Sequence, residues 1–248
     1  MILLLGGTRE ARNLAQHMAE AGVRFLVGDP VLPSGGQSVE ASVEPSGDPS
    51  NGKSAIRLSD AMQMRVIPDQ EALLTLFDGS DGGVDITAVI DAGPAFDSRT
   101  APCVALCQSR NLPYLRYERA GLRSQPGDAW HHVKGLDSLA DLIPVGARVL
   151  CEAGPVAAQI ETLLQGRCVT IVPAISSAQI VPTGTDAPDW IVVLRATAQR
   201  QCLDTARHTS LQVAMLSAPV DGTVERREHL LDALEWAEAQ AMASGEVI

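Results

Sequence analysis

The chain has 248 residues, 46% of them hydrophobic, which is enough to bury one large core or two smaller ones. Its formal net charge of −11 disfavours nucleic acid and anionic membrane surfaces as partners and favours small molecules. The longest apolar runs, such as Ile2 to Leu5, are far shorter than the roughly 20 residues of a membrane-spanning helix, and no secretory signal is evident, so we expect a cytoplasmic protein of undetermined oligomeric state.

The first part of the chain alternates between short apolar runs and segments with helical spacing. We expect strands at residues 1–5, 23–28, 62–67, 86–92 and 112–118, and helices at residues 9–21, 69–77 and 98–111. Residues 29–55 are dense in Pro, Gly and Ser and predict a long loop. Strand, helix and strand in this order predict βαβ units, and therefore a parallel sheet.

The same rhythm restarts after residues 125–128, where Pro and Gly accumulate. We expect strands at 147–153, 168–174, 189–196 and 211–217, and helices at 136–143, 155–164, 199–207 and 223–241. The sequence therefore predicts an α/β fold with two domains, residues 1–126 and residues 127–248, each with a mostly parallel sheet. A ligand is expected in a cleft between them, near the carboxyl ends of strands.

The turn Gly6-Gly7-Thr8 connects the first predicted strand to the first helix. Backbone amides at such a helix start, with no side chains in the way, form a cradle for a phosphate. The Thr8 hydroxyl either adds a donor or caps the helix, and Arg9 and Glu10 fall in the first turn, where Glu10 suits the helix dipole. The full dinucleotide pattern GxGxxG and the Walker motif are both absent, so an ordinary tight turn stays open as an alternative.

Three further residues are candidates for ligand contacts. Asp91 ends a predicted strand and can meet a ribose hydroxyl or a substrate nitrogen, or can serve as a helix cap. Arg116 and Arg119 lie in the segment "YLRYERAGLR" and can bind carboxylates, although Arg116 can instead pair with Glu118. Gly154 follows a strand of the second domain and either repeats the close-approach turn or belongs to an ordinary one.

The cysteines and histidines do not predict a metal site. Cys103 and Cys107 share one helix face, but no ligand set surrounds them, so we expect buried small hydrophobic side chains. His131 and His132 are adjacent on a predicted edge strand and point to opposite faces, so they do not form a chelate.

Three stretches, "ILLLGGTREARNLA", "VIDAGPAFDSRTAPCVALCQSRNLPYLRYERAGL" and "GDAWHHV", resemble the precorrin-6A reductase family of cobalamin biosynthesis in order and spacing. The resemblance implies two Rossmann-like domains and NADPH bound at the turn by Gly6, Gly7, Thr8, Arg9, Glu10 and Asp91. It further implies hydride transfer to a corrin-ring precursor, precorrin-6A or its cobalt form, a tetrapyrrole whose carboxylate arms suit Arg116 and Arg119. No side chain is singled out as the proton donor.

Two other functions stay open. The chain has Gly93-Pro94-Ala95 where the family tends to have Thr-His-Pro, and it lacks the glycine-rich stretch expected within residues 51–65 and the Thr-Lys-x-Ser-Gly-Gly turn expected near residues 192–201. These departures favour a divergent, non-catalytic binding or scaffolding protein on the same fold. The glycine turn alone is also compatible with a nucleotide-sugar or phosphate-binding α/β enzyme.

Overall fold

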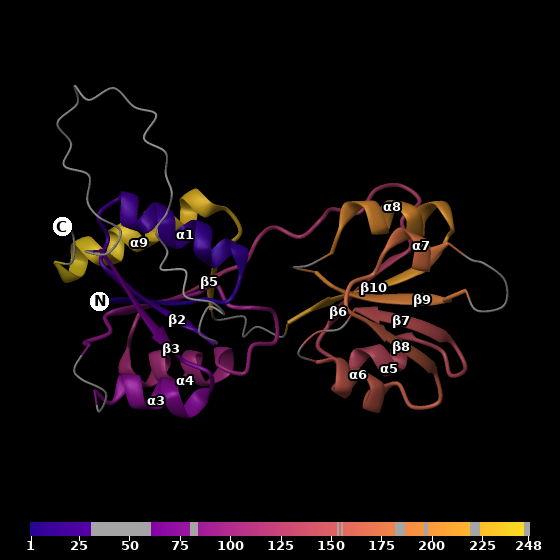
Figure 1. Cartoon of the computed structure of the whole chain (residues 1–248), viewed down its shortest axis with the longest axis horizontal. Helices are drawn as coiled ribbons and strands as arrows, with labels where there is room; N and C mark the ends of the chain where they lie inside the picture. The colour runs from indigo at the N-terminus through magenta and orange to yellow at the C-terminus, as the bar shows by residue number, and fades with distance from the viewer. Residues whose placement is uncertain are drawn as a thin grey trace, which may run out of the picture. The chain divides into compact units, whose positions relative to one another are not determined.

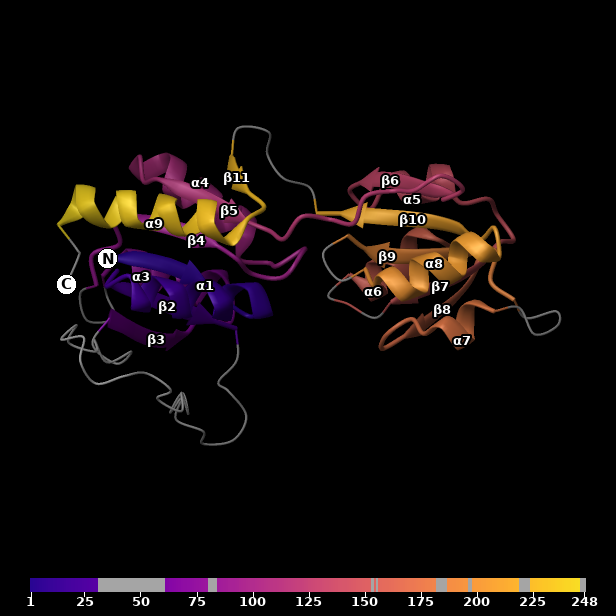
Figure 2. The same cartoon turned by 90° about the horizontal axis from the view of Figure 1, so that it is seen from above.

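The computed structural model describes residues 1–30, 61–79, 84–152, 154, 156–181, 187–195, 198–218 and 224–245 (Figures 1 and 2). The chain divides into two compact units. The first comprises Met1–Pro94, Ser98–Arg119 and Thr223–Ile248, and the second comprises Ala95–Asp97 and Ala120–Gly222. The predicted division into 1–126 and 127–248 differs from this one, because the C-terminal segment returns to the first unit.

The first unit is built on a six-stranded sheet in the order β11-β5-β4-β1-β2-β3, and every neighbouring pair is parallel. The strand β1 lies at its centre, where Leu4 is in register with Val27 on one side and Ile90 on the other. The strands are β1 Ile2–Leu5, β2 Phe25–Asp29, β3 Met62–Val66, β4 Ala88–Asp91, β5 Tyr114–Tyr117 and β11 Glu225–Arg227.

Helices cover both faces of this sheet, as a parallel sheet requires. The helices are α1 Arg9–Glu20, α3 Gln70–Phe77, α4 Thr100–Arg110 and α9 Leu230–Ser244. Helices α1 and α9 cover one face, and α3 and α4 cover the other (Figure 1). In α1 the apolar residues at helical spacing are buried against the sheet: Ala11, Leu14, Ala15, Met18 and Ala19.

The C-terminal segment corrects the prediction of one helix over residues 223–241. Residues Glu225–Arg227 form the edge strand β11 beside β5, and the helix α9 begins at Leu230. Small side chains of α9, such as Ala233 and Ala237, pack beside α1 (Figures 1 and 2). Trp236 of α9 donates to a carboxylate oxygen of Glu225 (3.1 Å), which ties the helix to the strand before it.

The second unit repeats the design with a five-stranded parallel sheet in the order β6-β10-β9-β7-β8. Helices α5 and α6 cover one face, and α7 and α8 cover the other (Figure 1). The elements are β6 Trp130–Lys134, α5 Ser138–Leu142, β7 Arg148–Glu152, α6 Ala157–Leu163, β8 Cys168–Val172, α7 Ser177–Ile180, β9 Trp190–Leu194, α8 Arg200–His208 and β10 Gln212–Ser217. The short helix α7 had not been predicted.

The expected fold class, α/β with mostly parallel sheets, is thereby confirmed.

The long loop predicted over residues 29–55 is only partly described. Its first residue, Asp29, belongs to β2, and residues 31–55 lie outside the described part of the chain. The strand β6 lies at a sheet edge, as expected from the histidine pair, and His131 bonds to Gln212 (2.8 Å).

The cysteines differ sharply in exposure. Cys103 and Cys107 are 0% and 1% exposed in the core between α4 and the sheet, as expected. Cys151 and Cys202 are also buried, whereas Cys168 is exposed. Burial raises the pKa of the Cys151 thiol to about 12, so its reactive thiolate is scarce near neutral pH.

We therefore expect one of the five cysteines, Cys168, to react quickly with a thiol reagent in the folded protein. Ellman's reagent at pH 8 measures the number of thiols that react quickly in the folded protein. In guanidinium, which unfolds the chain, the same reagent should react with all five thiols. The variant Cys168→Ser should remove the fast reaction while leaving four thiols in the unfolded chain. Two or more fast thiols in the folded protein would contradict the described core.

Candidate functional site at the glycine turn

The order of strands in the first sheet reverses between β1 and β4. From β1 the chain proceeds outward to β2 and β3, and from β4 it proceeds the other way to β5. In sheets of this kind the loops that follow the two central strands separate and leave a crevice at the carboxyl edge, where ligands bind. The turn Gly6-Gly7-Thr8 follows β1, and Ala92-Gly93-Pro94 follows β4, so the predicted turn lies at this switch point.

Neither glycine of the turn has room for a side chain. A Cβ on Gly6 would lie 2.3 Å from Oδ1 of Asp29, so the Asp29 carboxylate would have to move away from the turn. Gly7 has φ +111°, a conformation that favours glycine, and a Cβ there would lie 3.3 Å from Pro30 and 3.4 Å from Pro94. The two glycines are therefore required by the fold of the turn itself.

The backbone amides of the turn differ in what they bind. The Gly6 amide donates to the Gly28 carbonyl (2.9 Å), so it is not part of a cradle, and its residue contributes only open space. The Gly7 amide donates to the Asp29 carboxylate. Within the described residues no acceptor is found for the amides of Thr8, Arg9 and Glu10, the usual orphan donors at a helix start. These three amides are the ones that can hold an anion.

Thr8 caps helix α1. Its hydroxyl accepts from the Ala11 amide (3.0 Å) and donates to the Ala92 carbonyl (2.7 Å), which joins the two loops of the switch point. Of the two expected roles for this hydroxyl, the structure shows the helix cap. The hydroxyl proton is already used, so Thr8 offers a ligand its backbone amide only.

Asp29 is a site residue that the sequence analysis missed. It is the last residue of β2, half-buried, with its carboxylate beside Gly6 and Gly7. Burial raises the pKa of this carboxyl, and the charges of Arg99 and Arg12 and the Gly7 amide oppose the rise. Its signal in the sequence is its place, 23 positions after Gly6 and at the end of the second strand, where dinucleotide-binding folds carry an acidic residue roughly 20 residues beyond the glycines.

Asp91 and Arg116, expected to bind cofactor and substrate, bind each other instead. Asp91 is 0% exposed and Arg116 3%, and Nη1 of Arg116 lies 2.6 Å from Oδ1 of Asp91. The other bonds of this carboxylate come from the Gly93 amide (2.9 Å), the Thr100 hydroxyl (2.7 Å) and the Tyr114 hydroxyl (2.8 Å). The second guanidinium nitrogen of Arg116 donates to the Gly93 carbonyl (3.0 Å). These contacts use groups that a ligand would need, so the two predicted ligand roles find no support in this geometry.

In this cluster the opposite charges of Asp91 and Arg116 stabilise each other. Burial opposes the charge of Arg116, but the Asp91 carboxylate, aided by Glu118, outweighs it and raises the pKa of the guanidinium. Burial and the neighbouring Asp91 carboxylate also raise the pKa of Tyr114 far above its ordinary value, so this hydroxyl stays a donor. The cluster fixes the loop after β4, which forms one wall of the switch point.

Arg99 binds the carboxyl ends of the other strands and was not singled out from the sequence. It is fully buried, and its guanidinium donates to the carbonyls of Gly6, Gly28 and Ile67, each at 3.0 Å. These residues lie at or just beyond the ends of β1, β2 and β3. An arginine near the start of a helix has no sequence signal for this role.

Arg119 and Glu10 are two of the predicted site residues that reach solvent. Their side chains are 63% and 29% exposed, and they lie 4.0 Å apart in a loose ion pair. Arg9 is exposed as well, in the first turn of α1. Arg119 therefore remains available for an anionic group near the glycine turn, unlike Arg116.

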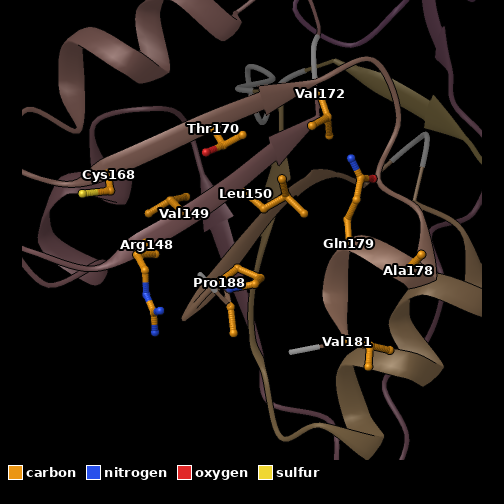
Figure 3. Close-up of a pocket in the computed structure, with 11 residues that line it drawn as sticks. Arg148, Val149, Leu150, Cys168, Thr170, Val172, Ala178, Gln179, Val181 and Pro188 are labelled. Atoms are coloured by element: carbon orange, nitrogen blue, oxygen red, sulfur yellow. The ribbon is translucent and has the colours of Figure 1, made fainter. Parts of the chain in front are cut away.

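A hollow of about 510 Å³ lies elsewhere, over strands β7 and β8 and helix α7 of the second unit (Figure 3). Leu150, Thr170 and Val172 line its strand side, and Gln179 lines its helix side. Among the described lining residues the charged one is Arg148, which is paired with Asp189 (2.8 Å). Gly154, the other predicted turn, follows β7, next to Leu194. The described lining therefore offers no unpaired charge to recognise a phosphate or a carboxylate, and the glycine turn is the better candidate site.

Metal and membrane contacts have no support in the described residues. No group of three or more His, Cys, Asp or Glu side chains within the described ranges is placed to hold a metal ion. None of the described helices is both long enough and apolar enough to cross a membrane.

A doubly wound parallel sheet with a glycine turn at its switch point defines a Rossmann-like α/β protein, and the comparisons with known proteins agree. Residues 82–201, a little under half of the chain, match the family model described as "Precorrin-6x reductase CbiJ/CobK". A solved structure of CobK precorrin-6A reductase matches with a TM-score of 0.63 at 19% identity, covering 96% of both chains. The resemblance seen in the sequence is thereby confirmed: the family model matches part of the chain, and the fold of CobK matches nearly all of it.

Other matches are more distant. TcdA (CsdL) has a TM-score of 0.37 at 12% identity, and E. coli tRNA N6-threonylcarbamoyladenosine dehydratase, TcdA, in complex with AMP has a TM-score of 0.35 at 13% identity. Both matches cover 98% of this chain and 87% of the other, and neither score supports an argument about this site. No curated protein matches the chain.

The buried pair gives a test of the described site. We expect Asp91→Asn to lower the free energy of unfolding by about 3–5 kcal/mol, because it leaves the Arg116 charge buried without a counterion. The double variant Asp91→Asn/Arg116→Met should recover at least about half of that loss, since it removes the stranded charge. Urea denaturation followed by circular dichroism measures all three proteins.

Asp189→Asn is the matched control for this measurement. It breaks the same kind of ion pair, with Arg148, where both side chains are about two-fifths exposed, and it should change stability by less than about 1 kcal/mol. An Asp91→Asn variant as stable as this control would show that Asp91 and Arg116 do not depend on each other.

Proposed function

We propose that this protein is a nicotinamide-dinucleotide-dependent reductase of a corrin-ring precursor, precorrin-6A or its cobalt form. The support is the family match together with the free amides of Thr8, Arg9 and Glu10 at the switch point of the first sheet. The resemblance implies NADPH as the reductant, and we propose the cytoplasm as the place of reaction. When bound, the reduced nicotinamide supplies the hydride for one conjugated double bond of the macrocycle.

The residues of the turn fit a dinucleotide. Gly6 and Gly7 leave the backbone bare, and the first-turn amides with the positive end of the α1 dipole can hold a pyrophosphate. Asp29 supplies an acceptor for ribose hydroxyls at the end of β2. We assign binding and orientation to these groups, and assign Asp91 and Arg116 to holding the loop after β4 in place.

The substrate would be recognised by charge. A corrin precursor carries many carboxylates, and the exposed guanidinium of Arg119 lies near the first turn of α1. The alternative of a non-catalytic protein on this fold is favoured by one observation, the use of Arg116 and Asp91 inside the fold. It predicts dinucleotide or tetrapyrrole binding without turnover.

Binding at the turn is tested by titrating the full chain with reduced dinucleotide and following nicotinamide fluorescence. We expect Gly7→Ala to weaken binding at least about tenfold, because an L residue at φ +111° strains the turn and its Cβ contacts Pro30 and Pro94. Consumption of precorrin-6A with oxidation of the dinucleotide separates a reductase from a binding protein.

Gly79→Ala is the control, because Gly79 also has positive φ (+71°) but has no atom within 4 Å of the added Cβ and lies after α3. It should lose about 1 kcal/mol of stability and keep its affinity for the dinucleotide. Absence of binding to either NADH or NADPH at millimolar concentration would reject the proposed function.

A further inference from the structure

Asp29 occupies the position that decides which dinucleotide fits. In a sheet of this order the residue at the end of the second strand lies beside the ribose that carries the adenine. Asp29 ends β2, and its backbone carbonyl accepts from the Ile67 amide (2.8 Å), so the residue is held in the sheet rather than in a loose loop.

The carboxylate of Asp29 is fixed against the turn. Its Oδ1 lies 2.3 Å from the position that a Cβ of Gly6 would take, and the Gly7 amide donates to the carboxylate. The two cations that act on it, Arg99 beneath the turn and Arg12 on α1, both favour its charged form. Arg99 is occupied by three carbonyls, whereas Arg12 is exposed and lies on the solvent side.

A fixed carboxylate treats the two reduced dinucleotides differently. It accepts hydrogen bonds from the 2′- and 3′-hydroxyls of NADH, whereas the 2′-phosphate of NADPH would bring about two negative charges against it. Among the described residues, Arg12 is the exposed cation that acts on Asp29. A 2′-phosphate beside Asp29 would meet the repulsion of its carboxylate, whereas a 2′-hydroxyl would donate to it.

We propose that Asp29 makes the site select a dinucleotide with a free 2′-hydroxyl, NADH, over its 2′-phosphorylated counterpart, NADPH. This inference rests on the proposed function and changes its reductant from the NADPH that the family resemblance implies. In this proposal Asp29 determines which dinucleotide binds, and it takes no part in substrate binding or in the hydride transfer.

The test is equilibrium binding of NADH and of NADPH to the full chain, by nicotinamide fluorescence and by calorimetry. We expect NADH to bind at least about tenfold more tightly, and the ratio to fall as salt is added. Asp29→Asn should reduce the ratio to about threefold or less, chiefly by strengthening the binding of NADPH. Glu20→Gln, which removes an exposed carboxylate at the far end of α1, should leave the ratio unchanged.

The unmodified protein gives a second measurement that does not depend on a variant folding. AMP should compete with NADH more strongly than adenosine 2′,5′-bisphosphate does. Equal or tighter binding of NADPH would overturn the inference and leave the proposed function standing. Failure of both dinucleotides to bind at millimolar concentration would overturn both.

Discussion

The guanidinium of Arg99 is the interaction on which the site depends. Parallel strands end with their carbonyl groups pointing the same way, and at the ends of β1, β2 and β3 three of these oxygens converge on one buried cation. Their hydrogen bonds compensate the loss of hydration that a buried guanidinium suffers. Because one of the three carbonyls belongs to Gly6, Arg99 also holds the start of the glycine turn against the sheet.

A second buried arginine completes this edge. Arg116 and Asp91 hold the loop after β4, and the Thr8 hydroxyl joins that loop to the turn after β1. An acidic protein has few cations, and here two of them act inside the fold instead of at a ligand. In the proposed function the anion is therefore held by the backbone amides of Thr8, Arg9 and Glu10, which need no counterion and are oriented by the helix.

Sequence pattern predicted the parallel sheets and the place of the glycine turn, and it gave the helix cap as one of two roles for Thr8, because strand period, apolar spacing and turn chemistry are local properties. It failed where a role depends on contacts between distant segments. Nothing local distinguishes Arg116 facing Asp91 from Arg116 facing a ligand, and nothing near residue 230 says that α9 packs beside α1. Asp29 was missed for a smaller reason: the predicted strand ended one residue too early, so an edge carboxylate was taken for part of a loop.

The two lines of support for function come from different parts of the chain. The family match spans residues 82–201 and leaves out the glycine turn, helix α1 and Asp29, which all lie within the first 30 residues. The family match therefore supports the proposed reaction, whereas the geometry of the first 30 residues supports the proposed choice of reductant. A change at the end of β2 can alter the choice between two dinucleotides without disturbing the rest of the sheet, because Asp29 touches the turn through its side chain while its backbone keeps the pairing with β3.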